Sequence, residues 1–170
     1  HPYCRCENPG PLPPDDRRLK MGVRLQTGIF DPGAETNAFL AAADDGAGAA
    51  VTFTGLVRSL PDDPIATLTL EHYPALAEKQ ISKMIDEATR RFSLMRAEVI
   101  HRYGTMRPGE PIVQVMTLAP HRRAAFEGAE FLMDYLKTSA PFWKKEEAGN
   151  GERWVAARDE DDRAQERWQK

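Results

Sequence analysis

The stretch HRRAAFEGAEFLMDYLKTSAPFWKKE (121–146) combines a helical apolar pattern with several basic residues. Four apolar residues recur at steps of three and four and therefore share one helical face: Phe126, Ala129, Met133 and Leu136. The helix should begin just after Pro120 and end before Pro141, because the residue ahead of a proline is disfavoured in the α conformation. We therefore predict that the chain is organised around this helix.

The two ends of this helix carry different basic groups. His121 and Arg122 lie at its N-terminal end, where free N–H groups and the helix dipole favour an anion. Lys137 lies at the other end, and a straight helix separates the two ends by roughly 22 Å. One small ligand cannot contact both ends. Either they serve different purposes, or two copies of the chain bring opposite ends together.

Length and composition indicate one ordinary globular domain. The chain has 170 residues, of which 41% are hydrophobic and 29% charged. Residues 1–20 are rich in proline and charge, so we expect a disordered extension or an added upstream segment there, and a single domain over 21–170. A net charge of -3 and a pI near 5.9 argue against binding to nucleic acid. Apolar runs are too short for a transmembrane helix, so no membrane partner is expected.

Both cysteines, Cys4 and Cys6, precede this domain. Their position excludes a disulfide framework, a cysteine zinc site and a cysteine nucleophile from residues 21–170. A cytoplasmic location fits this cysteine usage.

Segments with strand and helix periodicity alternate along the chain, which predicts an α/β (α+β) fold. The expected strands are 23–29, 49–57, 65–72, 97–103, 112–118 and a short segment at 153–157. The expected helices are 34–43, 74–92 and the central one. We predict that His101 and Arg102 form an edge pair, and that Trp154 and Val155 anchor the last segment.

Motif spacing excludes several kinds of chemistry. The chain has no Gly-x-Gly-x-x-Gly, Walker or Gly-x-Ser-x-Gly motif, and its histidines lack metal-ligand spacing, so neither a metal nor another cofactor is predicted. Lysine, arginine and histidine chemistry remains. Lys144 follows two aromatic residues and precedes Lys145, so a lowered pKa could make it a nucleophile or base. The alternative is a surface lysine pair. Similarly, Arg58 is either a site residue or a solvated arginine at a strand end.

Six segments resemble the catalytic (large) subunit family of molybdopterin synthase. They are VTFTGLVR (51–58), LTLEHYP (68–74), VIHRYG (99–104), APHRRAAFEGAEFLMDYLK (119–137), APFWKKE (140–146) and GERWVAARDED (151–161). They occur in order and cover most of 49–168, whereas residues 1–20 have no counterpart in the family.

This resemblance implies an α/β hammerhead fold with an additional antiparallel β-sheet subdomain. It also implies a homodimer within a heterotetramer, with a small ubiquitin-like sulfur-carrier subunit at each end. The carrier's C-terminal Gly-Gly thiocarboxylate would supply sulfur to cyclic pyranopterin monophosphate. Two such transfers would form the dithiolene of molybdopterin.

The resemblance also implies site residues. Lys137 and Lys144 would be the main catalytic lysines. The substrate-binding positions would be Leu56, Val57, Arg58, His121, Arg122, Lys137, Lys144, Lys145, Glu146 and Arg158. Combined with the length of the central helix, this predicts that His121 and Arg122 of one subunit complete the pocket holding the lysines of the other.

Two alternatives of other classes remain at this stage. One is a non-catalytic module whose lysines pair with the C-terminal carboxylate of a ubiquitin-like protein. The other is a phosphate- or RNA-binding domain, which the acidic pI disfavours.

Overall fold

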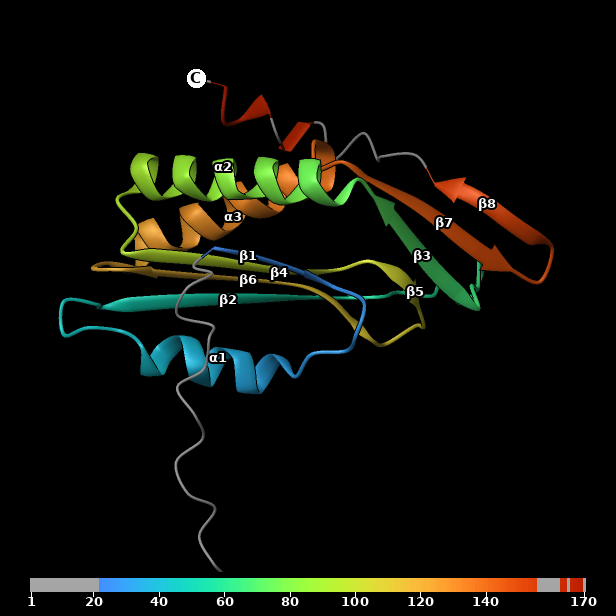
Figure 1. Cartoon of the computed structure of the whole chain (residues 1–170), viewed down its shortest axis with the longest axis horizontal. Coiled ribbons are helices and arrows are strands. Elements are labelled where there is room, and N and C mark those ends of the chain that lie inside the picture. Colours follow the sequence, from blue (N-terminus) through green and yellow to red (C-terminus); the bar gives the residue numbers. More distant parts are fainter. Residues whose placement is uncertain (1–21, 156–162, 165, 170) are drawn as a thin grey trace, which may run out of the picture.

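The computed structural model describes residues 22–155, 163–164 and 166–169. The first of its two sheets has four strands in the spatial order β1 (Val23–Gln26), β4 (Arg96–Arg102), β6 (Pro111–Ala119) and β2 (Ala49–Leu56). Strands β1 and β4 are parallel, whereas β4–β6 and β6–β2 are antiparallel. Helices α2 (Pro74–Phe92) and α3 (Arg122–Thr138) cover one face, and α1 (Pro32–Ala41) covers the other (Figure 1).

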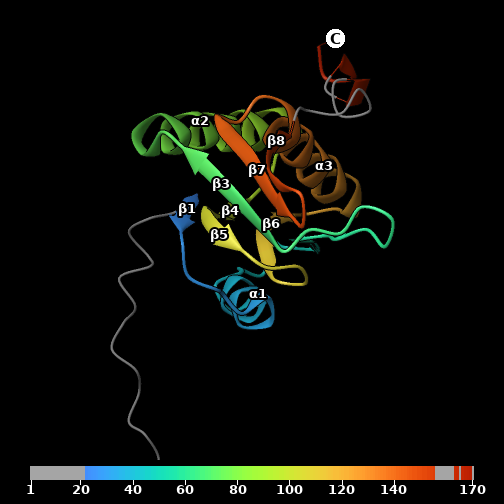
Figure 2. The same ribbon diagram turned by 90° about the vertical axis from the view of Figure 1, so that its right-hand side faces the viewer.

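The second sheet is entirely antiparallel and lies beyond one end of the first. Its spatial order is β5 (Gly104–Met106), β3 (Thr67–His72), β7 (Phe142–Ala148) and β8 (Gly151–Val155). Figure 2 looks onto this end, where β3 and β7 run side by side below helices α2 and α3. The predicted α/β domain with an additional antiparallel sheet is thus confirmed, although strands β5 and β7 were not predicted.

Local sequence accounts for the helix ends. Pro74 occupies the first turn of α2, where a missing N–H costs nothing, and Ser93 ends the helix in the left-handed conformation. Asp31 caps α1 by accepting hydrogen bonds from the N–H groups of Gly33 and Ala34. The central helix α3 begins and ends where the two prolines predicted.

The apolar face of α3 packs on the first sheet and on α2. Ala129 and Leu136 are buried in the main core as predicted, and Met133 packs against that core. Phe126, however, is 61% exposed, although the helical period places it on the same apolar side as these residues. The buried stripe also includes Ala125 and Leu132, and Thr117 of β6 donates a hydrogen bond to the Ala125 carbonyl at 2.7 Å.

Gly48 is required where the chain enters β2 beside the start of α3. Its N–H donates to the Ala119 carbonyl at 3.0 Å, and an added Cβ would lie 2.1 Å from the Pro120 carbonyl oxygen. We therefore expect Gly48→Ala to lower the free energy of unfolding by about 1–3 kcal/mol, measured in urea. Gly28→Ala is the control, because a Cβ there meets no described atom within 4 Å. Equal stability of the two variants would contradict the expectation.

Candidate functional site

The two candidate catalytic lysines converge on one buried ring. Lys137 lies in the last turn of α3, and Lys144 lies in β7 after a short connection. The charges of both lysines lower the pKa of His101, whose side chain is only 7% exposed. Lys137 and Lys144 therefore both lie close enough to His101, at the end of β4, to act on it electrostatically.

His101 is an uncharged group at ordinary pH. Burial lowers its pKa to about 4, against the raising effect of a hydrogen bond to the Arg102 carbonyl, and Lys144, His72 and Lys137 lower it further. The predicted edge pair is wrong, because β4 is an internal strand and both His101 and Arg102 are buried. Arg102 binds the Thr27 and Pro111 carbonyls and Glu110.

This buried imidazole should make stability depend on pH. An unfolded histidine takes up a proton below its ordinary pKa of 6.5, whereas folded His101 stays neutral down to about 4. The unfolded state then binds more protons, so lowering the pH from 7 to 4 should remove up to about 3 kcal/mol of stability through this residue. Urea unfolding at several pH values should give a shallower slope for His101→Phe than for wild type. Identical slopes would contradict this assignment.

Lys145 and Glu146 lie on opposite faces of β7, because side chains alternate along a strand. Lys145 pairs with Glu152 at 3.1 Å and lies 5.7 Å from the centre of the Trp154 ring. Lys145 therefore does not share a face of β7 with Lys144. The lysine that acts on the His101 ring together with Lys144 is Lys137. Trp154 is 59% exposed, so its prediction as a buried anchor is wrong, although β8 confirms a strand there.

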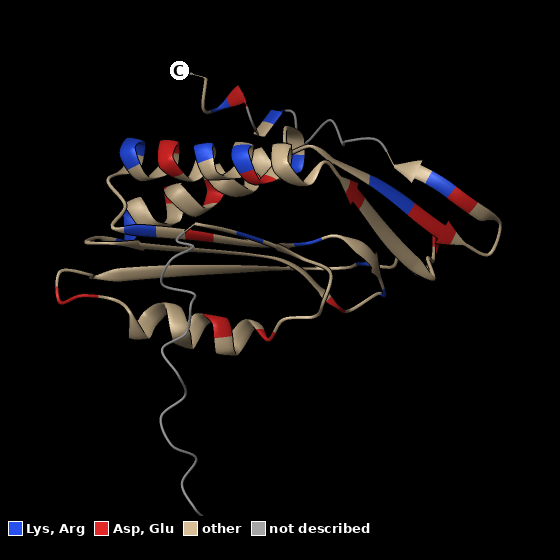
Figure 3. Ribbon diagram, in the orientation of Figure 1, with Lys and Arg blue, Asp and Glu red and all other residues tan. Residues whose placement is uncertain are grey.

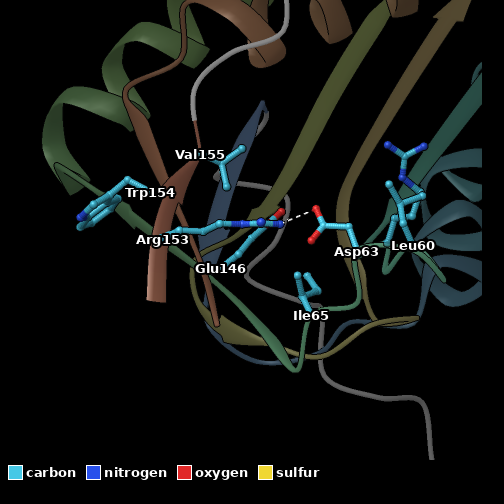
Figure 4. Close-up of a pocket in the computed structure, with 8 residues that line it drawn as sticks. Leu60, Asp63, Ile65, Glu146, Arg153, Trp154 and Val155 are labelled. Atoms are coloured by element: carbon cyan, nitrogen blue, oxygen red, sulfur yellow. Dashed lines mark hydrogen bonds and ion pairs between the residues drawn. The ribbon is translucent and has the colours of Figure 1, made fainter. Parts of the chain in front are cut away.

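Glu146 belongs to a pocket of about 270 Å³ between the 58–65 segment and strands β7 and β8. It is lined by Arg58, Leu60, Asp63, Ile65, Glu146, Arg153, Trp154 and Val155. In Figure 4, Arg153 extends between two carboxylates, and its guanidinium contacts Asp63 at 2.6 Å and Glu146 at 2.9 Å. Figure 3 shows a basic block followed by an acidic block along β7, and one acidic and one basic residue on β8.

Arg153 and Asp63 were not among the predicted site residues. The register of the β7–β8 hairpin would have indicated Arg153, because it pairs this residue with Glu146 on the neighbouring strand. That register depends on the tight turn between Ala148 and Gly151, which falls between the central stretch and the predicted strand at 153–157. Asp63 comes from a loop whose path no periodic pattern predicts.

The end of β2 places three predicted residues in three different environments. Leu56 is 58% exposed, Val57 is 4% exposed within the core of the second sheet, and Arg58 is exposed at the pocket. The β2–β6 register shifts at Leu56, so the chain bends just before Arg58. Val57 also exchanges backbone hydrogen bonds with the 109–110 turn. A side-chain contact between Val57 and a ligand is therefore not available, and this residue supports the loop that carries Arg58.

His121 and Arg122 are exposed at the opposite end of α3 from Lys137. His121 is the N-cap residue, and its side chain makes no capping hydrogen bond. Roughly 22 Å of helix separates these residues from the lysines, so one protomer does not bring the two groups together. Arg158 lies outside the described residues.

Within the described part of the chain, no group of three or more histidine, cysteine and acidic residues could hold a metal ion. Nor does any helix in that part have the length and apolarity needed to cross a membrane.

Comparison with known proteins gives one consistent family. The family model described as MoaE protein matches residues 25–139. The molybdopterin synthase catalytic subunit of Pseudomonas aeruginosa is 49% identical over 150 residues, covering 88% of this chain and 99% of that protein. Its Escherichia coli counterpart is 52% identical over 122 residues, covering 71% and 81%. A solved structure, the molybdopterin biosynthesis MoaE protein from Burkholderia ambifaria, has a TM-score of 0.74 and 46% identity, covering 88% and 98%.

Proposed function

Because this chain belongs to the MoaE protein family, we propose that it is the catalytic subunit of a molybdopterin synthase. In this role it transfers sulfur from the C-terminal thiocarboxylate of a small ubiquitin-like carrier protein to cyclic pyranopterin monophosphate. The product is the dithiolene of molybdopterin. The observation that carries the proposal is that Lys137 and Lys144, from different elements, both act electrostatically on the buried His101 ring and lower its pKa.

The cysteine content supports a sulfur source outside this chain. The only cysteines are Cys4 and Cys6, both upstream of the family match. The domain therefore has no thiol that could carry a persulfide, and sulfur must arrive on another molecule. A thiocarboxylate at the end of a partner's flexible tail meets this requirement, and two positive lysines suit its negative charge.

We assign the basic residues two tasks. Arg58, His121 and Arg122 hold the cyclic phosphate and the pterin, since arginine presents a planar fork that matches phosphate oxygens. One of Lys137 and Lys144 acts as the base or proton donor while the thiocarboxylate sulfur attacks the pterin side chain. The other stabilises the thiocarboxylate and the acyl intermediate. Each transfer forms a carbon–sulfur bond on the pterin side chain, where a carbon–oxygen bond breaks and the oxygen leaves as water. Water then hydrolyses the thioester that links carrier and substrate, which breaks the carbon–sulfur bond on the carrier and restores its carboxylate.

The proposed active site is shared between two protomers. His121 and Arg122 stand too far from Lys137 along α3 to contact the same small substrate. In a two-fold dimer, the N-terminal end of one α3 can complete the site at the C-terminal end of the other. One carrier subunit at each of the two sites gives a heterotetramer.

Reconstitution tests this function directly. The purified chain is mixed with a thiocarboxylated carrier and cyclic pyranopterin monophosphate, and molybdopterin formation is measured. Turnover is expected with the thiocarboxylated carrier, and none with the same carrier ending in an ordinary carboxylate. A chain that binds the carrier tail without forming molybdopterin would instead be a non-catalytic binding module, and the proposal would be wrong.

A further inference from the structure

Phe142, at the start of β7, stacks on two histidines. Its ring stacks on His101 with centroids 4.2 Å apart and an interplanar angle of 14°. It also stacks on His72, with centroids 5.7 Å apart and an interplanar angle of 25°. His101 belongs to the first sheet and His72 to the second, so the Phe142 ring joins the two sheets two residues before Lys144.

The polar atoms of His101 are not equivalent. Nδ1 lies 2.8 Å from the Arg102 carbonyl oxygen, which can only accept a hydrogen bond, so Nδ1 carries the proton. In a neutral imidazole the other nitrogen, Nε2, is then an acceptor. The backbone of its own strand thus selects the tautomer, and the ring offers one uncharged lone pair.

The same ring lies within electrostatic reach of both lysines. Lys137 and Lys144 come from different elements, joined only by residues 139–141, and their charges act on His101 together. A positively charged side chain at position 101 would add a third positive group beside the two lysines. An apolar ring at this position would provide no hydrogen-bond acceptor. A neutral imidazole avoids the repulsion and keeps a hydrogen-bond acceptor beside two groups that are only donors.

We propose that His101 is a positioning residue for the lysine pair: its ring fixes the start of β7 through Phe142, and its Nε2 lone pair accepts a hydrogen bond from a lysine ammonium group. This inference rests on the proposed function, because the lysines need a defined geometry only if they act on bound substrate. Misplacing a catalytic group by about 1 Å can cost about 100-fold in rate.

Three substitutions separate positioning from a role in folding alone. His101→Phe keeps a ring for stacking and removes both nitrogens. His101→Asn places an amide N–H near the position of Nδ1, and His101→Gln places an amide oxygen near the position of Nε2. All three are assayed in the complex with thiocarboxylated carrier and cyclic pyranopterin monophosphate, with kcat and KM determined separately and thermal unfolding followed.

The proposal predicts a specific pattern of rescue. His101→Phe and His101→Asn should lose about 10- to 100-fold in kcat with little change in KM, whereas His101→Gln should recover most of the rate. Gln114→Leu is the control for stability, since Gln114 is fully buried on the neighbouring strand β6 and bonds to Pro32 and Thr36. It should lose stability but keep its kcat.

Two results would overturn the proposal. The first is a His101→Phe enzyme with wild-type kcat, or one whose loss of rate follows its loss of stability as in Gln114→Leu. The second is histidine ¹⁵N NMR of the wild-type protein showing the proton of His101 on Nε2. If the wild-type complex itself forms no molybdopterin, the proposed function fails, while the NMR result still reports on His101.

Discussion

Replacing Lys137 or Lys144 by alanine should reduce molybdopterin formation by about 10²- to 10⁴-fold, the range expected for loss of a positioned proton-transfer group. We propose different tasks for the two lysines, so neither is expected to replace the other. The fold should survive, because Lys137 is exposed in the last turn of α3 and Lys144 is only partly buried in β7. The rate is measured in single turnover, with excess complex over cyclic pterin.

Two lysines on α2 provide matched controls for this experiment. Lys79 and Lys83 are exposed on a helix that carries no predicted site residue, so their alanine variants should retain the wild-type rate. Circular dichroism and thermal unfolding should be unchanged in all four variants. A Lys137→Ala enzyme with full activity would show that the assignment of this lysine is wrong.

Mixing two inactive variants should restore activity if the active site spans two protomers. Arg122→Ala removes a proposed substrate-binding group at one end of α3, and Lys137→Ala removes a proposed catalytic group at the other. In a mixed dimer, one site carries both substitutions and the other carries neither. Random exchange of subunits makes half the dimers mixed, so the mixture should regain about a quarter of the wild-type rate.

The control for complementation uses two substitutions in the part of the shared site that a single protomer supplies. Lys137→Ala mixed with Lys144→Ala leaves every site of a mixed dimer without one lysine, so no recovery is expected. Exchange of subunits is verified by mass spectrometry of differently tagged chains. If the Arg122→Ala and Lys137→Ala chains form mixed dimers without recovering activity, the site does not combine these ends of two protomers.

The central helix α3 shows what a local sequence pattern can and cannot predict. Pro120 and Pro141 predicted the limits of this helix, and α3 lies between these two prolines. The period of its apolar residues places Phe126 on the same side as the buried Leu136, yet Phe126 is exposed. A helical period states which residues share a side. The neighbours on that side decide which of them become buried.

The histidines illustrate the opposite case. His101 was predicted at an edge because two polar residues at the end of a strand are typical of an exposed end. The structure has β4 between β1 and β6, and His101 is buried against Phe142 from a segment forty-one residues away in sequence. Strand order is set by long-range pairing, which no local pattern records.

By itself, the sequence determined where α2 and α3 begin and end, that the domain has no thiol for carrying sulfur, and that basic groups stand at both ends of one helix. These properties depend on residue type and on spacing along the chain. Three further relations depend on tertiary contacts. Lys137 and Lys144 both lower the pKa of His101, Arg153 pairs with Asp63 and with Glu146, and Lys145 lies on the opposite face of β7 from Lys144 and pairs with Glu152. Those relations arise from the register of a second sheet against the first, where distant segments meet because burial and hydrogen bonding are satisfied together.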